Sequence, residues 1–127
     1  MTEHKHQVLF FKTLSLQEKQ DPRLKNVFAV PNGGKRNVVN GRRMKAEGLK
    51  SGVPDIVVAI PVEPFHGMFI EMKNKTIGGK KAGRTSATQE DWLERLSTAG
   101  YATTVAYGFD EAYDALLTYL AAKWQNK

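Results

Sequence analysis

The strongest constraint on the fold is a pair of apolar runs separated by a short turn that contains two prolines. The runs cover residues 55–60 and 67–74, and the prolines are Pro61 and Pro64. Short runs rich in Ile, Val, Met and Phe are typical of buried β-strands, and the turn between them predicts an antiparallel hairpin. Centring the turn at Glu63 places both prolines where no ladder hydrogen bond is required.

That centre also fixes the predicted register of the hairpin. Asp55 faces Glu71 in this register, and Val57 faces Phe69. Because side chains alternate between the two faces of a strand, Lys73 points to the same side of the sheet as both carboxylates.

The N-terminal part of the chain predicts a helix, a strand and a second helix. Residues 3–20 carry apolar side chains at helical spacing and predict an amphipathic helix. Its predicted apolar face consists of Val8, Leu9, Phe10, Phe11, Leu14 and Leu16. A short strand is predicted at residues 26–30, and a short basic helix at residues 37–47.

The C-terminal part predicts a helix, a strand and a last helix. Residues 86–89 form a capping-box sequence before a helix that Gly100 ends. A strand is predicted at residues 102–107, and a last helix begins at Asp110. A strand–helix–strand order implies a right-handed parallel crossover. We therefore predict one domain over residues 1–127, an α/β fold with a mixed β-sheet flanked by α-helices.

Composition excludes several classes of protein. The 127 residues include no cysteine, which excludes disulfides, thiolate zinc sites and a cysteine nucleophile. No apolar run approaches the roughly 18 residues of a membrane helix, so neither membrane insertion nor secretion is expected. We expect a cytoplasmic protein.

The positive charge is clustered in the middle of the chain. The net charge is +6, and residues 35–50 and 73–84 hold eleven of the nineteen lysines and arginines. Clustering of this kind favours a nucleic acid partner, although a solvated cationic surface is the alternative. The predicted DNA contacts are Asn32, Gly33, Gly34, Lys35, Arg36, Arg42, Arg43, Lys50, Lys75, Lys80, Lys81 and Arg84.

The two opposed carboxylates predict a metal site. Asp55 and Glu71 interrupt apolar strands, where a lone carboxylate is costly, and directly opposed side chains are close enough to share one hard cation. Two carboxylates with Lys73 beside them suit phosphodiester hydrolysis assisted by Mg²⁺ or Mn²⁺. The alternative is a cross-strand cluster of salt bridges without catalysis. Zinc is not predicted, because His4 and His6 lie on different faces of a helix.

The same residues resemble a known signature. Pro54-Asp55 followed by Glu71-Met72-Lys73 is similar to the signature of the PD-(D/E)XK nuclease superfamily. Further segments extend the likeness over nearly the whole chain, and in order and spacing they resemble the VRR-NUC domain in its minimal stand-alone form. These segments are residues 31–34, 52–55, 69–73, 86–89 with Trp92 and Leu96, 100–101 and 107–112. Residues 75–85 depart from the family pattern, because this loop is longer and more basic.

The resemblance implies a set of site residues and their roles. Asp55 and Glu71 would be the metal-binding carboxylates, and Lys73 the catalytic lysine. The main-chain carbonyl of Met72 would be a further metal ligand. Glu3 would reach the metal directly or through water, although an acid is also favoured at any helix N-terminus. Gln89 would lean over the site, although it is equally the glutamine of a capping box.

The resemblance also implies an activity. We expect a Mg²⁺- or Mn²⁺-dependent endonuclease of branched DNA, similar to a Holliday-junction resolvase and acting as a homodimer. Leu9, Phe10 and Leu16 are candidates for the dimer surface. The alternatives are a nuclease of linear or flapped DNA, a basic DNA-binding module without catalysis, and an RNA-processing role.

Overall fold

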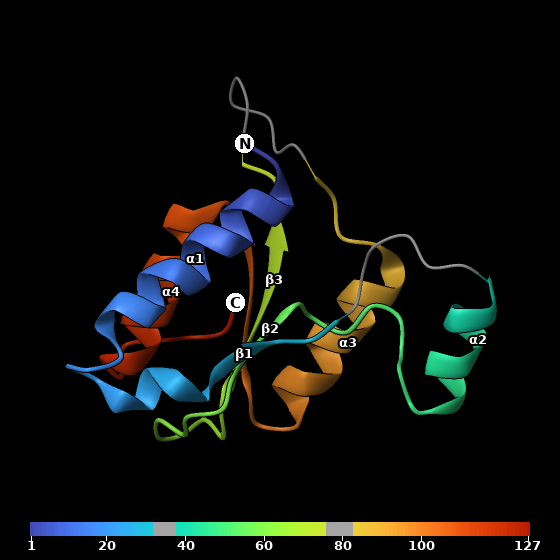
Figure 1. The fold of residues 1–127 in the computed structure, drawn as a ribbon. Helices are drawn as coiled ribbons and strands as arrows, with labels where there is room; N and C mark the ends of the chain where they lie inside the picture. The colour runs from blue at the N-terminus through green and yellow to red at the C-terminus, as the bar shows by residue number, and fades with distance from the viewer. Residues whose placement is uncertain (32–37, 76–82) are drawn as a thin grey trace.

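A four-stranded mixed sheet with helices on both faces forms the framework of the protein (Figure 1). The computed structural model describes residues 1–31, 38–75 and 83–127. The strands lie in the order β1 (Val27–Ala29), β2 (Ile56–Val58), β3 (Met68–Lys73) and β4 (Ala102–Tyr107). Strands β1, β2 and β3 pair antiparallel, and β4 pairs parallel to β3. The mixed α/β fold is therefore confirmed.

The helices divide between the two faces of the sheet. Helices α1 (Glu3–Gln17) and α4 (Phe109–Leu120) cover one face, and α3 (Ala87–Thr98) lies on the other (Figure 1). A 3-10 helix, η1 (Pro22–Asn26), follows α1, and α2 (Val38–Ala46) lies to the side of the sheet. Among the described residues, no helix is both long and apolar enough to cross a membrane.

The hairpin has the predicted register. Ile56 pairs with Ile70, Val57 with Phe69, and Val58 with Met68. The prolines fall in the turn between the strands, as the prediction required. Asp55, directly before β2, therefore lies opposite Glu71.

The core lies between the sheet and the α1–α4 layer. Even-numbered residues of the hairpin strands face this layer, and they pack with apolar side chains of both helices. The largest fully buried members are Phe10, Leu14, Ile56, Met68, Ile70, Met72, Leu116 and Tyr119.

The predicted apolar face of α1 was partly wrong. Val8 is 51% exposed and Leu16 is 77% exposed, whereas His6, Phe10 and Leu14 are buried. These three residues are spaced four apart and therefore form one stripe along the helix. The prediction placed every apolar residue of this segment on the buried face of the helix, but packing on the sheet buries only this stripe.

The cap and the glycine that bound α3 are those predicted from the sequence. The Ser86 hydroxyl accepts a hydrogen bond from the Gln89 N–H, and the Gln89 side chain accepts one from the Ser86 N–H, so the capping box of α3 is present. Gly100 ends this helix with a φ of 101°, a conformation that only glycine adopts readily. On α4, Leu117 is exposed, whereas Ala115, Leu116 and Tyr119 face the core.

Tyr119 connects α4 to the hairpin turn. Its hydroxyl donates to the Ile60 carbonyl at 2.6 Å and accepts from the Val62 N–H at 3.2 Å. The side chain is fully buried. One hydroxyl therefore satisfies two backbone groups where the chain leaves β2.

We expect Tyr119→Phe to lower the free energy of unfolding by about 1–3 kcal/mol, because it leaves two backbone groups near the core unpaired. Urea denaturation measures the change as a shift of the midpoint at constant slope. Tyr113→Phe is the matched control, since the Tyr113 hydroxyl pairs only with the Gln17 side chain among the described residues. Equal losses in the two variants would contradict the role given to Tyr119.

Candidate active site

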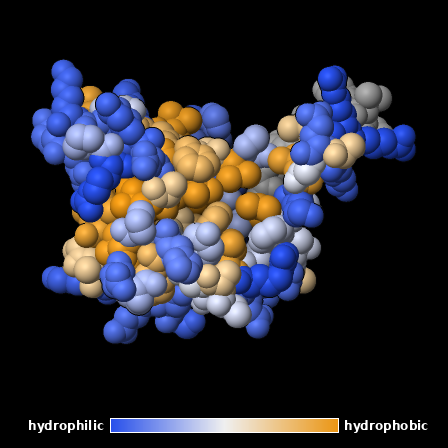
Figure 2. Space-filling view, turned by 90° about the horizontal axis from the view of Figure 1, so that it is seen from below, coloured by the Kyte–Doolittle hydropathy of each residue, from blue (hydrophilic) through white to orange (hydrophobic). Residues whose placement is uncertain are grey.

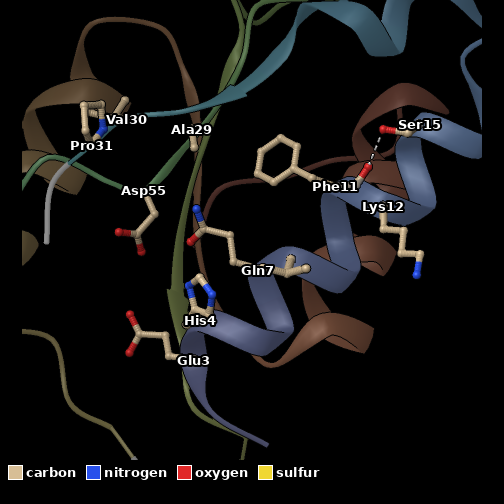
Figure 3. A pocket seen from close by; sticks show the side chains of 11 residues that line it. Glu3, His4, Gln7, Phe11, Lys12, Ser15, Ala29, Val30, Pro31 and Asp55 are labelled. Carbon is tan, nitrogen blue, oxygen red and sulfur yellow. Dashed lines mark hydrogen bonds between the residues drawn. The ribbon is translucent and has the colours of Figure 1, made fainter. Parts of the chain in front are cut away.

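Three carboxylates from separate parts of the chain converge at one end of the hairpin. They belong to Glu3 at the start of α1, Asp55 before β2, and Glu71 in β3, and one oxygen from each lies within 4.8 Å of the others. Figure 3 shows Glu3 and Asp55 projecting into the same space. The Thr2 hydroxyl caps α1 by accepting a hydrogen bond from the Lys5 N–H. This cap sets Glu3 as the first residue of the helix.

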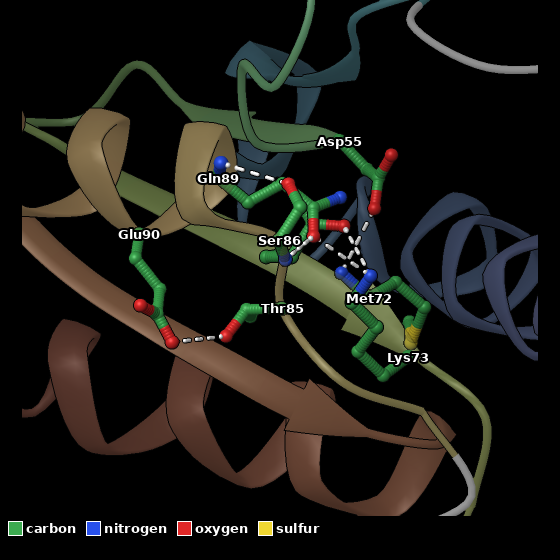
Figure 4. A network of polar contacts seen from close by, with 8 residues as sticks. Asp55, Met72, Lys73, Thr85, Ser86, Gln89 and Glu90 are labelled. Atoms are coloured by element: carbon green, nitrogen blue, oxygen red, sulfur yellow. Dashed lines mark hydrogen bonds and ion pairs between the residues drawn. The ribbon is translucent and has the colours of Figure 1, made fainter.

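Asp55 is held by backbone contacts on both neighbouring strands. Its Oδ2 accepts the Met72 N–H at 2.9 Å (Figure 4). Its own carbonyl accepts the N–H of Val30, directly after β1, at 2.8 Å. The carboxylate thus takes the place of a ladder partner for β3. The predicted register brought Asp55 and Glu71 together, and this contact fixes Asp55 at that position.

Glu71 carries a carboxylate in an environment that disfavours its charge. The residue is 2% exposed, and its Oε1 has no hydrogen-bond partner among the described residues. Burial raises the pKa of the Glu71 carboxyl to about 9, and the hydrogen bond and charge of Asp55 act in the same direction. Burial, followed by the charge of Asp55, also raises the pKa of Glu3.

The three carboxylates fit a hard divalent cation. A cation between them would allow all three carboxylates to ionise together, and it would give the unpartnered Oε1 of Glu71 a ligand role. The donor set consists of carboxylate oxygens, which suit Mg²⁺ or Mn²⁺ rather than a metal that prefers sulfur or imidazole.

Lys73 and Gln89 complete the polar cluster. The Lys73 ammonium donates to Gln89 Oε1 at 3.0 Å and lies 3.9 Å from Glu71 Oε2 (Figure 4). The same Gln89 oxygen accepts the Ser86 N–H at 2.9 Å. Gln89 therefore caps α3 and holds the lysine at the same time. The backbone at Gly83 lies against the Lys73 stem, because a Cβ there would meet Lys73 Cδ at 3.3 Å.

The predicted DNA contacts fall into two groups. Arg42, Arg43, Lys50, Lys75 and Arg84 are described and exposed. Two of them have acidic partners: Lys75 pairs with Asp110 at 3.1 Å, and Arg43 pairs with Glu47 at 3.4 Å. The remaining predicted contacts lie outside the described residues. They are Asn32, Gly33, Gly34, Lys35, Arg36, Lys80 and Lys81.

Sequence reasoning missed two features near the site. His6 is buried, and its Nδ1 accepts the Phe109 N–H at 3.0 Å, which ties the start of α1 to the start of α4. A cleft of about 910 Å³ lies between α1 and β1, and both Glu3 and Asp55 line it. The positions of Phe10 and Leu14, four and eight residues after His6, were the signal that His6 faces the core.

We expect Glu71→Gln to stabilise the protein at alkaline pH when no metal is present. The folded protein retains a proton on Glu71 that the unfolded chain releases above the ordinary pKa of 4.5. The stability that this proton provides is full below about pH 4.5 and is lost as the pH rises toward about 9. In EDTA at pH 8, the free energy of unfolding of the variant should therefore exceed that of wild type by at least about 1 kcal/mol, which corresponds to a few degrees in Tm.

Thermal melts at pH 4.5 and pH 8, with EDTA or Mg²⁺, test this expectation. Near pH 4.5 the two proteins should melt at similar temperatures, and Mg²⁺ should stabilise wild type more than the variant. Glu94→Gln, at an exposed position on α3, controls for removing a carboxylate. A wild-type Tm that rises in EDTA from pH 6 to pH 9 would contradict the buried, protonated state of Glu71.

Comparisons with known proteins identify the fold and the family of the chain. A solved structure named VRR_NUC domain protein superposes with a TM-score of 0.75 at 23% identity, covering 96% of this chain and 90% of its own. That likeness shows the fold. No curated protein matches the sequence. The sequence model of the VRR-NUC domain matches residues 1–110. The chain therefore belongs to the VRR-NUC family of the PD-(D/E)XK nuclease superfamily.

Proposed function

We propose that this protein is a Mg²⁺- or Mn²⁺-dependent endodeoxyribonuclease that cleaves branched DNA in the manner of a Holliday-junction resolvase. The observation that carries the proposal is the convergence of Glu3, Asp55 and Glu71 beside the ammonium of Lys73. Family membership supports the nuclease class. The preference for branched DNA is the proposed refinement.

The proposal assigns the metal to four groups. They are the carboxylates of Asp55, Glu71 and Glu3 and the main-chain carbonyl of Met72. When bound, a divalent cation supplies Lewis-acid polarisation of the phosphate and lowers the pKa of a coordinated water. Glu3 contributes from α1, so the metal site joins the helical layer to the sheet.

The proposal assigns the remaining chemistry to side chains of this chain. Lys73 stabilises the negative charge that develops on the phosphoryl oxygens, because its ammonium lies beside the carboxylates. Gln89 is a positioning residue, since it acts by holding the ammonium of Lys73.

The basic surface supports a DNA substrate. Arg42 and Arg43 are exposed on α2, and Lys50 follows this helix. Figure 2 shows that the segment carrying α2 projects from the body of the molecule and is largely hydrophilic. We assign these cations to phosphate contacts on a DNA arm, together with exposed Arg84.

Cleavage of both strands of a junction requires two active sites, which supports a homodimer. Leu9 and Leu16 of α1 are exposed and remain candidates for the dimer surface. Phe10 was also predicted there, but this part of the prediction was wrong because the residue is fully buried in the core.

We expect wild type to nick a labelled four-way junction symmetrically in Mg²⁺ or Mn²⁺ and to be inactive in EDTA. Asp55→Ala, Glu71→Ala and Lys73→Ala should each lower the rate by at least about 100-fold. Flap, linear duplex and RNA substrates tested in parallel define the preference, and Glu94→Ala is the matched control.

If flap or linear DNA is cleaved faster than the junction, the resolvase assignment is wrong and the protein is instead a nuclease of flapped or linear DNA. Junction binding without cleavage in any metal would contradict a catalytic role and indicate a DNA-binding module.

We expect Gln89→Ala and Ser86→Ala to separate positioning of Lys73 from helix capping. Each variant removes one of the two hydrogen bonds of the capping box and should lose about 0.5–2 kcal/mol of stability. Only Gln89→Ala frees the ammonium of Lys73, so only this variant should lower kcat, by about tenfold or more. Gln89→Glu keeps the cap and should retain stability. Equal kcat values for the two alanine variants would show that Gln89 only caps α3.

A further inference from the structure

The cleft between α1 and β1 is a feature that the proposed chemistry does not use. Its volume is about 910 Å³, and Glu3 and Asp55 form the end nearest the metal site (Figure 3). The cleft is therefore continuous with the candidate active site. Volumes of this size are typical of sites for small ligands, rather than of surfaces that follow a duplex.

The lining of the cleft suits a flat aromatic ligand with polar edges. Val8, Phe11 and Ala29 provide apolar surface, and the Phe11 ring lies in the space between α1 and β1 (Figure 3). Gln7 extends toward Asp55 and offers both a donor and an acceptor. Exposed Lys12 is among the lining residues and adds a positive charge to this side of α1.

A nucleobase has these properties. Its faces stack on aromatic side chains regardless of base identity, and its edge carries hydrogen-bonding groups. One sugar joins each base to its phosphate, so a phosphate at the carboxylates brings the attached base to the mouth of the cleft. A base can enter only after it leaves the stack of the duplex.

We propose that this cleft receives one unpaired nucleobase of the cleaved strand, next to the scissile phosphate. The inference rests on the proposed nuclease function and deepens it. Unstacking a base is easier at a branch point than within a continuous duplex. The cleft thus gives the enzyme a physical reason to prefer branched DNA, without reading its sequence.

Abasic substitution in the substrate tests the proposal with the intact protein. A single abasic residue is moved through each position around the scissile phosphate of the four-way junction. We expect kcat/KM to decrease about tenfold or more at one position adjacent to the cut, and to change less than about twofold elsewhere. The affinity of wild type for the same junctions in EDTA should show a loss at that same position.

Cleft variants provide the second arm. Ala29→Phe fills the cleft from an exposed position on β1, and Phe11→Leu removes the ring while keeping apolar packing. Both should cut the unmodified junction more slowly, and the abasic residue should cost either variant little further activity. Phe28→Leu is the matched control, because Phe28 is 49% exposed on the same strand and does not line the cleft. Stabilisation by Mg²⁺ in thermal melts shows that the variants keep the metal site.

The outcomes separate this proposal from the nuclease assignment. Absence of cleavage in every DNA contradicts the proposed function, and the binding arm in EDTA still decides whether a base occupies the cleft. Cleavage and affinity that do not depend on the abasic position overturn the cleft proposal alone. The proposal is also overturned if the activity losses caused by Ala29→Phe and by the abasic residue are additive. Conversion of a dimer to a monomer by Ala29→Phe would overturn it too, because the cleft would then be assigned to a second copy of the chain.

Discussion

The burial of the Glu71 carboxylate is the interaction on which the candidate site depends. A charged group inside a sheet is unfavourable unless another group compensates for it. Here the nearest ionisable neighbours are two further carboxylates and one ammonium, and the ammonium is 3.9 Å away. One ammonium does not balance three ionised carboxylates, so without a metal the pKa of Glu71 is raised to about 9 and this carboxyl keeps its proton at neutral pH. A divalent cation at this position would supply the missing positive charge, and the surrounding fold holds the three carboxylates together.

Three structural devices keep the opposing charges in place. The hairpin register sets Asp55 opposite Glu71, the Thr2 cap sets the start of α1 at Glu3, and the α3 capping box holds Lys73 through Gln89. Each device depends on hydrogen bonds between segments close in the chain: ladder bonds in the hairpin, and side-chain bonds at Thr2, Ser86 and Gln89. The site is therefore preorganised by local structure that does not require a ligand, which would limit the reorganisation needed for a metal or DNA to bind.

The same locality explains what the sequence could predict. Residues close in the chain determine the strands of the hairpin, its register and the α3 cap. The pattern of apolar residues and the types of residue in the turn were therefore sufficient to predict these features. The burial of His6 and the exposure of Val8 depend on how α1 rotates against the sheet and α4. The sequence of α1 has apolar residues on nearly every side, so its pattern does not select one orientation. The cleft between α1 and β1 was missed for the same reason, because it exists only once two distant segments are placed side by side.

The protected edge of the sheet bears on how two copies could meet. Strand β4 is the last in the sheet, and two of its N–H groups are already occupied by side chains: that of Thr103 by Asn126 Oδ1, and that of Tyr107 by Glu111 Oε1. A second chain that added a strand here would have to displace both contacts, which disfavours edge pairing. The exposed leucines lie instead on the helical layer, with Leu16 on α1 and Leu117 on α4. Association through that layer would leave both the carboxylate cluster and the segment carrying α2 free to contact DNA.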